Sequence, residues 1–126
     1  RVVVMEGYNA RYLKKEDFPG SFAPVDLVVV DCSFISLRLI LPVAIALLRP
    51  GGRIVALIKP QFEAGRREAG RGRGVIRDRT VQARVVEELR TFVVERLGLR
   101  WCAVMESPLR GPAGNVEFLV HLEKPC

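Results

Sequence analysis

The chain has 126 residues, the size of one ordinary domain, and its 49% hydrophobic and 27% charged residues are typical of a globular protein. No apolar run is long enough to span a bilayer, which argues against an integral membrane protein. Lys and Arg total 20 against 14 Asp and Glu, giving a net charge of +6. This excess favours a polyanionic partner but does not prove one.

Neither metal binding nor histidine chemistry is indicated. Cys32, Cys102 and Cys126 lack the spacing of metal ligands, and they are typical of reduced thiols in a cytoplasmic protein. The only histidine, His121, lies in an apolar run, so it is a poor candidate for catalysis. We therefore expect no metal centre.

The chain opens with an apolar run, residues 1–5, which predicts a strand. Because no Met precedes it, we expect the chain to be a piece of a longer protein. A loop and a short helix over residues 10–17 should follow, and the Pro and Gly at residues 19–20 should end that helix. The apolar run 26–30 then predicts a strand buried on both faces.

The next predicted helix covers residues 37–48, with Ser36 as its N-cap. Pro42 lies inside this helix and predicts a kink or a late start. The sequence Pro50-Gly51-Gly52 should end it, and residues 53–58 form the next expected strand. A long loop should then run to Gly74.

A second amphipathic helix should begin at Asp78 or Thr80 and stop at Gly98. Two final strands, 99–105 and 116–122, are separated by a Gly- and Pro-rich turn at residues 111–115. Such a close pair is typical of an antiparallel hairpin. The order of elements predicts an α/β sheet that ends in this antiparallel pair.

Charged residues end two of the expected buried strands. Asp31 follows the run 26–30, and Lys59 follows the run 53–58. Because ligands of open α/β sheets bind at the carboxyl ends of strands, these two residues are candidates for one site. Glu117, inside the apolar run 116–120, is a third candidate. Each charge could instead be a turn residue or a solvated rim pair, but three together favour a functional site.

A loop rich in glycine and arginine follows Lys59. Residues 64–74 contain four glycines and four arginines, namely Arg66, Arg67, Arg71 and Arg73. Guanidinium groups bind phosphate oxygens bidentately, so these arginines are candidates for phosphate contacts. A mobile, solvated loop is the alternative interpretation. The glycines match neither a P-loop nor a G-x-G-x-x-G motif.

Four segments carry a family resemblance: VVVDCSFISL (28–37), LIKPQFEAGR (57–66), GVIRD (74–78) and GPAGNVEFL (111–119). In this order they resemble the TlyA group of FtsJ-like RNA ribose 2′-O-methyltransferases, bacterial proteins often labelled hemolysin A. The resemblance covers nearly the whole chain. It implies S-adenosylmethionine (SAM) as methyl donor and 2′-O-methylation of ribose in ribosomal RNA, with cytidine the usual base.

The resemblance also assigns residues. It places the Asp, the second Lys and the Glu of the family's Lys-Asp-Lys-Glu tetrad on Asp31, Lys59 and Glu117. Asn9 and Asp31 correspond to positions at the cofactor. Ribosomal RNA or ribosomal subunits would be the partner, and the four loop arginines would contact the RNA.

The family's first lysine, its glycine-rich SAM loop and its N-terminal S4-like RNA-binding domain have no counterpart in this sequence. We therefore expect residues 1–126 to be the C-terminal part of a Rossmann-like, SAM-dependent methyltransferase domain that is inactive alone. The strand 1–5 should be separated from the strand 26–30 by the space of two missing strands. The strand carrying Glu117 should lie antiparallel to the strand that ends at Lys59.

Transfer of a methyl group to a ribose hydroxyl needs exact positioning and an acceptor for the proton. Lys59 is the candidate base, but it could instead stay charged and orient the hydroxyl, and the sequence does not separate these roles. A basic RNA-binding module without catalysis is the alternative to an enzyme. A membrane-lytic protein follows only from the family's old label, since neither predicted helix is a basic amphipath rich in Trp or Phe.

Overall fold

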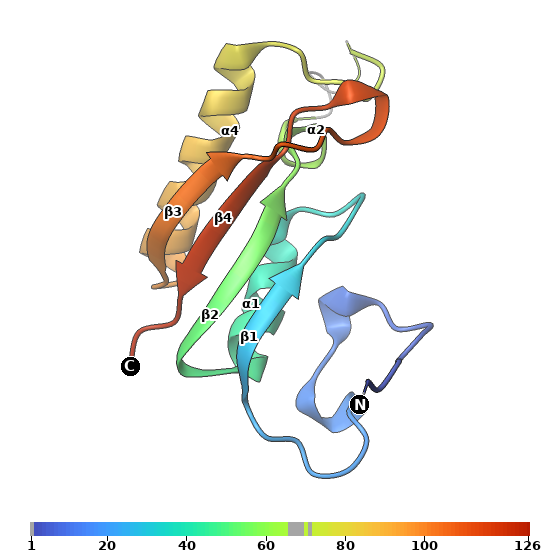
Figure 1. Ribbon diagram of the computed structural model, residues 1–126, viewed down its shortest axis with the longest axis vertical. Helices are drawn as coiled ribbons and strands as arrows, with labels where there is room; N and C mark the ends of the chain where they lie inside the picture. Colours follow the sequence, from blue (N-terminus) through green and yellow to red (C-terminus); the bar gives the residue numbers. More distant parts are fainter. Residues whose placement is uncertain (1, 66–69, 71) are drawn as a thin grey trace.

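The computed structural model describes residues 2–65, 70 and 72–126 and contains one mixed, open sheet. Its strands lie in the order β1-β2-β4-β3 (Figure 1), with bounds Val25–Val30 (β1), Leu48–Ile58 (β2), Phe118–Glu123 (β4) and Arg100–Glu106 (β3). β1 and β2 are parallel, whereas β4 is antiparallel to both β2 and β3. The predicted fold class, an α/β sheet ending in an antiparallel pair, is confirmed.

Two helices cover the same face of the sheet, behind the strands in Figure 1. α1, Leu37–Leu47, begins where the Ser36 hydroxyl accepts a hydrogen bond from the amide of Arg38 at 3.0 Å. α4, Arg79–Thr91, begins in the same way at Asp78, whose carboxylate accepts from Thr80 at 2.8 Å. α4 continues as a π-helical turn, Phe92–Arg96, before Gly98 reverses the chain at φ +67°.

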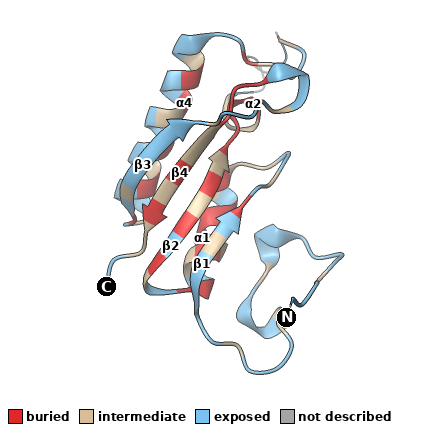
Figure 2. Cartoon of the chain, viewed as in Figure 1, coloured by how far each residue is buried: buried red, intermediate tan, exposed pale blue. Residues whose placement is uncertain are grey.

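The core lies between these helices and the sheet (Figure 2). Alternate residues of β2 point toward the helices, so Ile54, Ala56 and Ile58 are buried while the residues between them are only partly covered. From the helices, Leu41 and Leu89 fill the same layer. This packing fixes the carboxyl end of β2, from which Lys59 extends.

The expected first strand is wrong within the described residues. Residues 2–5 form no strand, and Val2, Val3 and Val4 are exposed. A strand needs a hydrogen-bonded neighbour, and β1 pairs only with β2. The predicted helix over 10–17 is likewise replaced by two 3₁₀ turns, Ala10–Tyr12 and Lys15–Asp17, both without buried residues that could stabilise a longer helix.

Several predicted boundaries also move. α1 starts at Leu37 without delay and runs through Pro42, and β2 begins at Leu48, five residues earlier than predicted, because Leu48 pairs with Val25 across an irregular register. Part of the expected long loop is a short helix, α2, Pro60–Glu63. β4 begins at Phe118, so Glu117 lies just before the strand.

The insertion of β4 beside β2 is confirmed, with Ile58 opposite Phe118 at the end of the ladder. A short 3₁₀ turn, Pro112–Gly114, leads into it. Within the described part of the chain, no helix is long and apolar enough to cross a membrane.

Candidate functional site

The parallel pairing of β1 and β2 brings Asp31 and Lys59 to the same edge of the sheet. Asp31 directly follows Val30, the last residue of β1, and Lys59 directly follows Ile58, the last residue of β2. Parallel strands end at one edge, so both loops start side by side. The two residues predicted from separate strands therefore meet in one place.

Asp31 and Lys59 form an ion pair, with Lys59 Nζ 2.5 Å from Asp31 Oδ1. Lys59 Nζ also donates to the hydroxyl of Ser33 at 3.3 Å. The lysine side chain is only 10% exposed, whereas that of Asp31 is 63% exposed. The apolar stem of Lys59 is thus packed in the protein while its nitrogen is held at the solvent-facing end of the site.

Glu117 lies at the same edge, but its polar partner is not Lys59. Ile58 and Phe118 are the last pair of the β2–β4 ladder. Lys59 directly follows Ile58, and Glu117 directly precedes Phe118, so both lie just beyond the end of the ladder. The Glu117 side chain is buried, and its Oε2 accepts a hydrogen bond from Gln61 Nε2 at 3.3 Å. The structure therefore brings Asp31 and Lys59 into contact and places Glu117 at the same sheet edge, where its side chain is bonded to Gln61.

The short helix α2 makes a second connection between the β1–α1 loop and the segment after β2, in addition to the Lys59–Asp31 ion pair. Glu63, at its end, accepts hydrogen bonds from the Ser36 hydroxyl at 2.6 Å and the Leu37 amide at 2.7 Å, at the start of α1. Burial raises the pKa of the Glu63 carboxyl, against the opposing effects of these hydrogen bonds and of Arg38. The β1–α1 loop is thus joined to the segment after β2 by both an ion pair and a helix cap.

Sequence reasoning did not single out Ser33, Phe34, Gln61, Phe62 or Glu63. Phe34 is 89% exposed, has a φ of +63°, and its ring lies 5.0 Å from that of Phe62, centre to centre. A bulky residue with positive φ costs about 1–3 kcal/mol, and such strain concentrates at functional sites. The signal available in the sequence was an aromatic residue three positions after Asp31, and polar residues at alternate positions after Lys59.

The two residues assigned to the cofactor lie at adjoining hollows. Asn9 lines one of about 640 Å³, together with residues of the β1–α1 loop and α2, and Asp31 lines a smaller one of about 260 Å³ beside Ala10. The side-chain oxygen of Asn9, Oδ1, caps a 3₁₀ turn by accepting from the Arg11 amide at 3.1 Å, while the Asp31 carboxylate is 63% exposed and paired with Lys59. These two acceptor groups, with the hollows beside them, suit the hydroxyl and amino groups of a nucleoside-containing ligand.

Only one of the four arginines predicted to bind RNA lies within the described residues. Arg66, Arg67 and Arg71 lie outside the described residues. Arg73 is exposed and has a φ of +54°. Among the described residues, no group of three or more His, Cys, Asp or Glu side chains could hold a metal ion.

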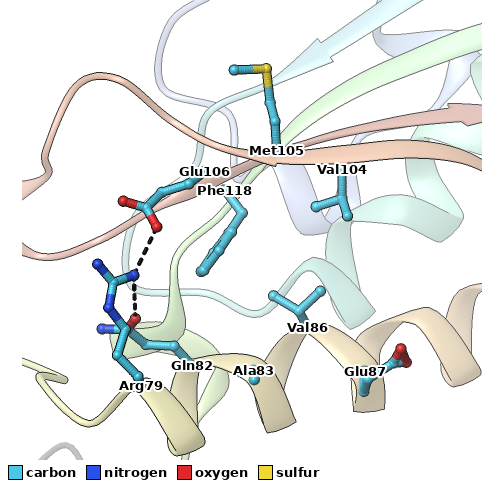
Figure 3. A pocket seen from close by; sticks show the side chains of 9 residues that line it. All are labelled: Arg79, Gln82, Ala83, Val86, Glu87, Val104, Met105, Glu106 and Phe118. Carbon is cyan, nitrogen blue, oxygen red and sulfur yellow. Dashed lines mark hydrogen bonds and ion pairs between the residues drawn. The ribbon is translucent and has the colours of Figure 1, made fainter.

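A separate groove of about 430 Å³ lies between α4 and β3 (Figure 3). Arg79 closes one end by donating to Glu106 at 2.7 Å and to Gln82 at 3.3 Å. The other lining residues are Ala83, Val86, Glu87, Val104, Met105 and Phe118. None of the predicted site residues that the structure describes lines this groove, which is distinct from the hollows beside Asn9 and Asp31.

The sheet order, with a parallel pair and an inserted antiparallel strand, defines a Rossmann-like methyltransferase fold. A solved SAM-dependent methyltransferase of Methanosarcina mazei has the same fold, with a TM-score of 0.57 at 14% identity over 94% of this chain and 65% of that chain. The chain belongs to the FtsJ-like methyltransferase family, whose profile matches residues 1–124.

Two relatives are much more similar. The chain is 45% identical over 122 residues to the Mycobacterium tuberculosis protein named 16S/23S rRNA (cytidine-2'-O)-methyltransferase TlyA, covering 97% of this chain and 44% of the relative. A crystal structure of a "putative hemolysin" from Lactococcus lactis is 45% identical, with a TM-score of 0.88, covering 98% of this chain and 57% of that one. The resemblance to the TlyA group is therefore confirmed, and the chain spans less than half the length of the TlyA protein.

Proposed function

We propose that the protein carrying this chain uses SAM to methylate the 2′-hydroxyl of a ribose, usually of cytidine, in ribosomal RNA. The observation that carries the proposal is the Lys59–Asp31 ion pair at the carboxyl edge of the sheet, with the buried Glu117 beside it. The name of the TlyA relative supports RNA ribose as the substrate. A protein that acts on ribosomal RNA would work in the cytoplasm.

SAM supplies a methyl group on a sulfonium, which is a strong leaving group. Asp31 and Asn9 are the residues of this chain that would hold it. Lys59 Nζ, which contacts Asp31 and Ser33, would control the proton of the attacking ribose hydroxyl. Glu117, fixed by Gln61, would accept a hydrogen bond from the same region of the substrate. Fixed positions for these groups lower the barrier by orienting the hydroxyl for in-line attack.

Features at the mouth of the site suit RNA. The net charge of +6 favours a polyanion, and the exposed ring of Phe34 offers a surface on which an unstacked base can stack. The arginines at positions 66, 67, 71 and 73 would contact phosphates. Together these would hold a ribose near Lys59.

The test uses the full-length gene product, ribosomal subunits or their extracted RNA, and SAM with a radioactive methyl group. Transfer to RNA, followed by recovery of a 2′-O-methylated nucleoside in its digest, is the expected result. Mass spectrometry of the digest identifies the base. RNA binding without any transfer would instead establish a non-catalytic RNA-binding module, and methyl groups on bases alone would refute the ribose assignment.

A further inference from the structure

The carboxylate of Glu117 is enclosed from two sides. On one side Gln61 Nε2 donates to its Oε2 at 3.3 Å, and both side chains are buried, with residue exposures of 7%. On the other side stands Gly111, where an added Cβ would overlap the same oxygen. No real side chain can approach so closely, so only glycine leaves this carboxylate in place.

The backbone around Glu117 is fixed as well. The Ser107 amide donates to the Glu117 carbonyl at 2.8 Å, and the Gly111 amide donates to the Asn115 carbonyl at 2.8 Å. These bonds close the β3–β4 connection on itself and hold Gly111 against Glu117. The close approach of Gly111 to the Glu117 carboxylate therefore belongs to a loop whose backbone is held by hydrogen bonds.

Gln61 makes this contact at a cost. Its NH₂ group must face the carboxylate, because the carbonyl end would repel it, and so its Oε1 atom is left buried with no hydrogen-bond partner among the described residues. A buried carbonyl without a hydrogen-bond partner destabilises a protein. An apolar side chain would avoid that cost but would leave the buried Glu117 carboxylate without this hydrogen-bond donor, so the glutamine serves the carboxylate.

Gln61 is also rigidly linked to Lys59. The Phe62 amide donates to the Lys59 carbonyl at 2.8 Å, and the Ala64 amide donates to the carbonyl of the fully buried Pro60 at 2.8 Å. This single turn fixes the position of Gln61 relative to Lys59. A shift of Gln61 would therefore change how Glu117 and Lys59 lie relative to each other.

We propose that Gln61 and Gly111 are positioning residues that hold the Glu117 carboxylate in the orientation needed for methyl transfer. The inference rests on the proposed function, since it assumes that Glu117 takes part in the reaction. Both residues act through Glu117 and need not touch the substrate. Gln61 also lines the hollow beside Asn9, and Met keeps a side chain of similar size there, so substitution should lower the rate of the chemical step far more than it changes the binding of SAM or RNA.

The experiment uses the full-length protein and compares Gln61→Met and Gly111→Ala with two matched controls. Gln82→Met replaces a glutamine that is also buried but donates to the Ile76 carbonyl rather than to the Glu117 carboxylate. Gly52→Ala creates a clash of 2.6 Å with Leu48 at the opposite end of β2. The controls share the chemical change and the reduced stability but leave Glu117 untouched.

Single-turnover rates are measured at saturating SAM and RNA, with dissociation constants for each ligand and a urea unfolding curve. Gln61→Met and Gly111→Ala should each lower the rate by about 10- to 100-fold, because small misplacements of reacting groups cost that much. Their dissociation constants and the rates of both controls should stay within about twofold. The double variant should be less impaired than the product of the single effects, because both act on one carboxylate.

The outcomes separate this inference from the proposed function. If Glu117→Gln keeps the wild-type rate, the role of Glu117 in the proposed function fails. If Glu117→Gln loses activity but Gln61→Met and Gly111→Ala do not, only the positioning inference is overturned. Equal losses in Gln61→Met and Gln82→Met, or strictly multiplicative effects in the double variant, overturn it too. Should Gln61→Met not fold, Gln61→Leu and Gly111→Ala carry the same comparison.

Discussion

Replacing Lys59 by Met should remove methyl transfer and leave the fold nearly as stable as before. Met keeps most of the apolar stem that packs below the site, and only the ammonium group is removed. Its partner, Asp31, has a side chain that is 63% exposed, so the freed carboxylate stays solvated. A pair of this kind contributes about 0–1 kcal/mol to folding. Losing a proton-transfer group, by contrast, costs about 10²–10⁴ in rate, which corresponds to about 2.7–5.4 kcal/mol of barrier.

Lys124→Met is the matched control, because it should keep methyl transfer but lower the stability of the fold. Lys124 Nζ donates to the carbonyls of Ile45 at 2.9 Å and Leu48 at 2.8 Å, at the end of α1 and far from the sheet's carboxyl edge. Losing two charge-assisted bonds should lower the free energy of unfolding by about 2 kcal/mol or more. Urea unfolding and single-turnover kinetics are measured on both variants of the full-length protein. The reasoning is refuted if Lys59→Met keeps more than a tenth of the rate, or if it is destabilised as much as Lys124→Met.

Three further predictions test the rest of the molecule. The isolated chain should bind SAM weakly or not at all and the full-length protein should bind it, so calorimetry showing tight binding by residues 1–126 would contradict the expected missing cofactor loop. Replacing Arg66, Arg67, Arg71 and Arg73 by Ala should weaken RNA binding and lower the salt slope by up to about 0.9 log units for each phosphate that is no longer bound, with SAM affinity kept; an unchanged slope would make them a solvated loop. Burial raises the pKa of Glu63 above its usual 4.5, so the folded state binds the Glu63 proton more tightly than the unfolded state does. The stability that this proton contributes is present below about pH 4.5 and is lost as the pH rises through the raised pKa. Glu63→Gln should remove this fall from a series of urea curves between pH 4 and 8, and identical curves for both proteins would refute it.

The parts of the fold that could be predicted are those with a local signal. β1 and β2 are apolar runs bounded by turn residues, and parallel pairing then brings the residues after them, Asp31 and Lys59, together at one edge. The caps Ser36 and Asp78 are equally local, since each accepts from an amide two residues on. A strand end, a helix cap and a sheet edge each follow from a few neighbouring residues.

The features that the sequence did not predict depend on partners far away in the chain. Residues 2–5 have the composition of a strand, but a strand forms only where a neighbour offers hydrogen bonds. Among the described residues, β1 pairs with β2 and with no other strand. Leu48 fits a helix face as well as a strand, and only its pairing with Val25 decides for the strand. The partners of Gln61 and Glu63 are 56 and 26 residues away, so no local pattern could reveal them.

The short turn α2 explains how three elements can meet at one site. Lys59, directly before it, reaches back to Asp31 after β1; Gln61 reaches Glu117 before β4; and Glu63 reaches the start of α1. Residues two apart on a helix point about 200° apart, because each residue turns the chain by about 100°. Gln61 and Glu63 therefore extend to opposite sides, and one turn suffices to bridge β4 and α1. Lengthening this turn by one residue would rotate Glu63 away from α1 while leaving Gln61 on Glu117, so the spacing of these three residues matters as much as their chemistry.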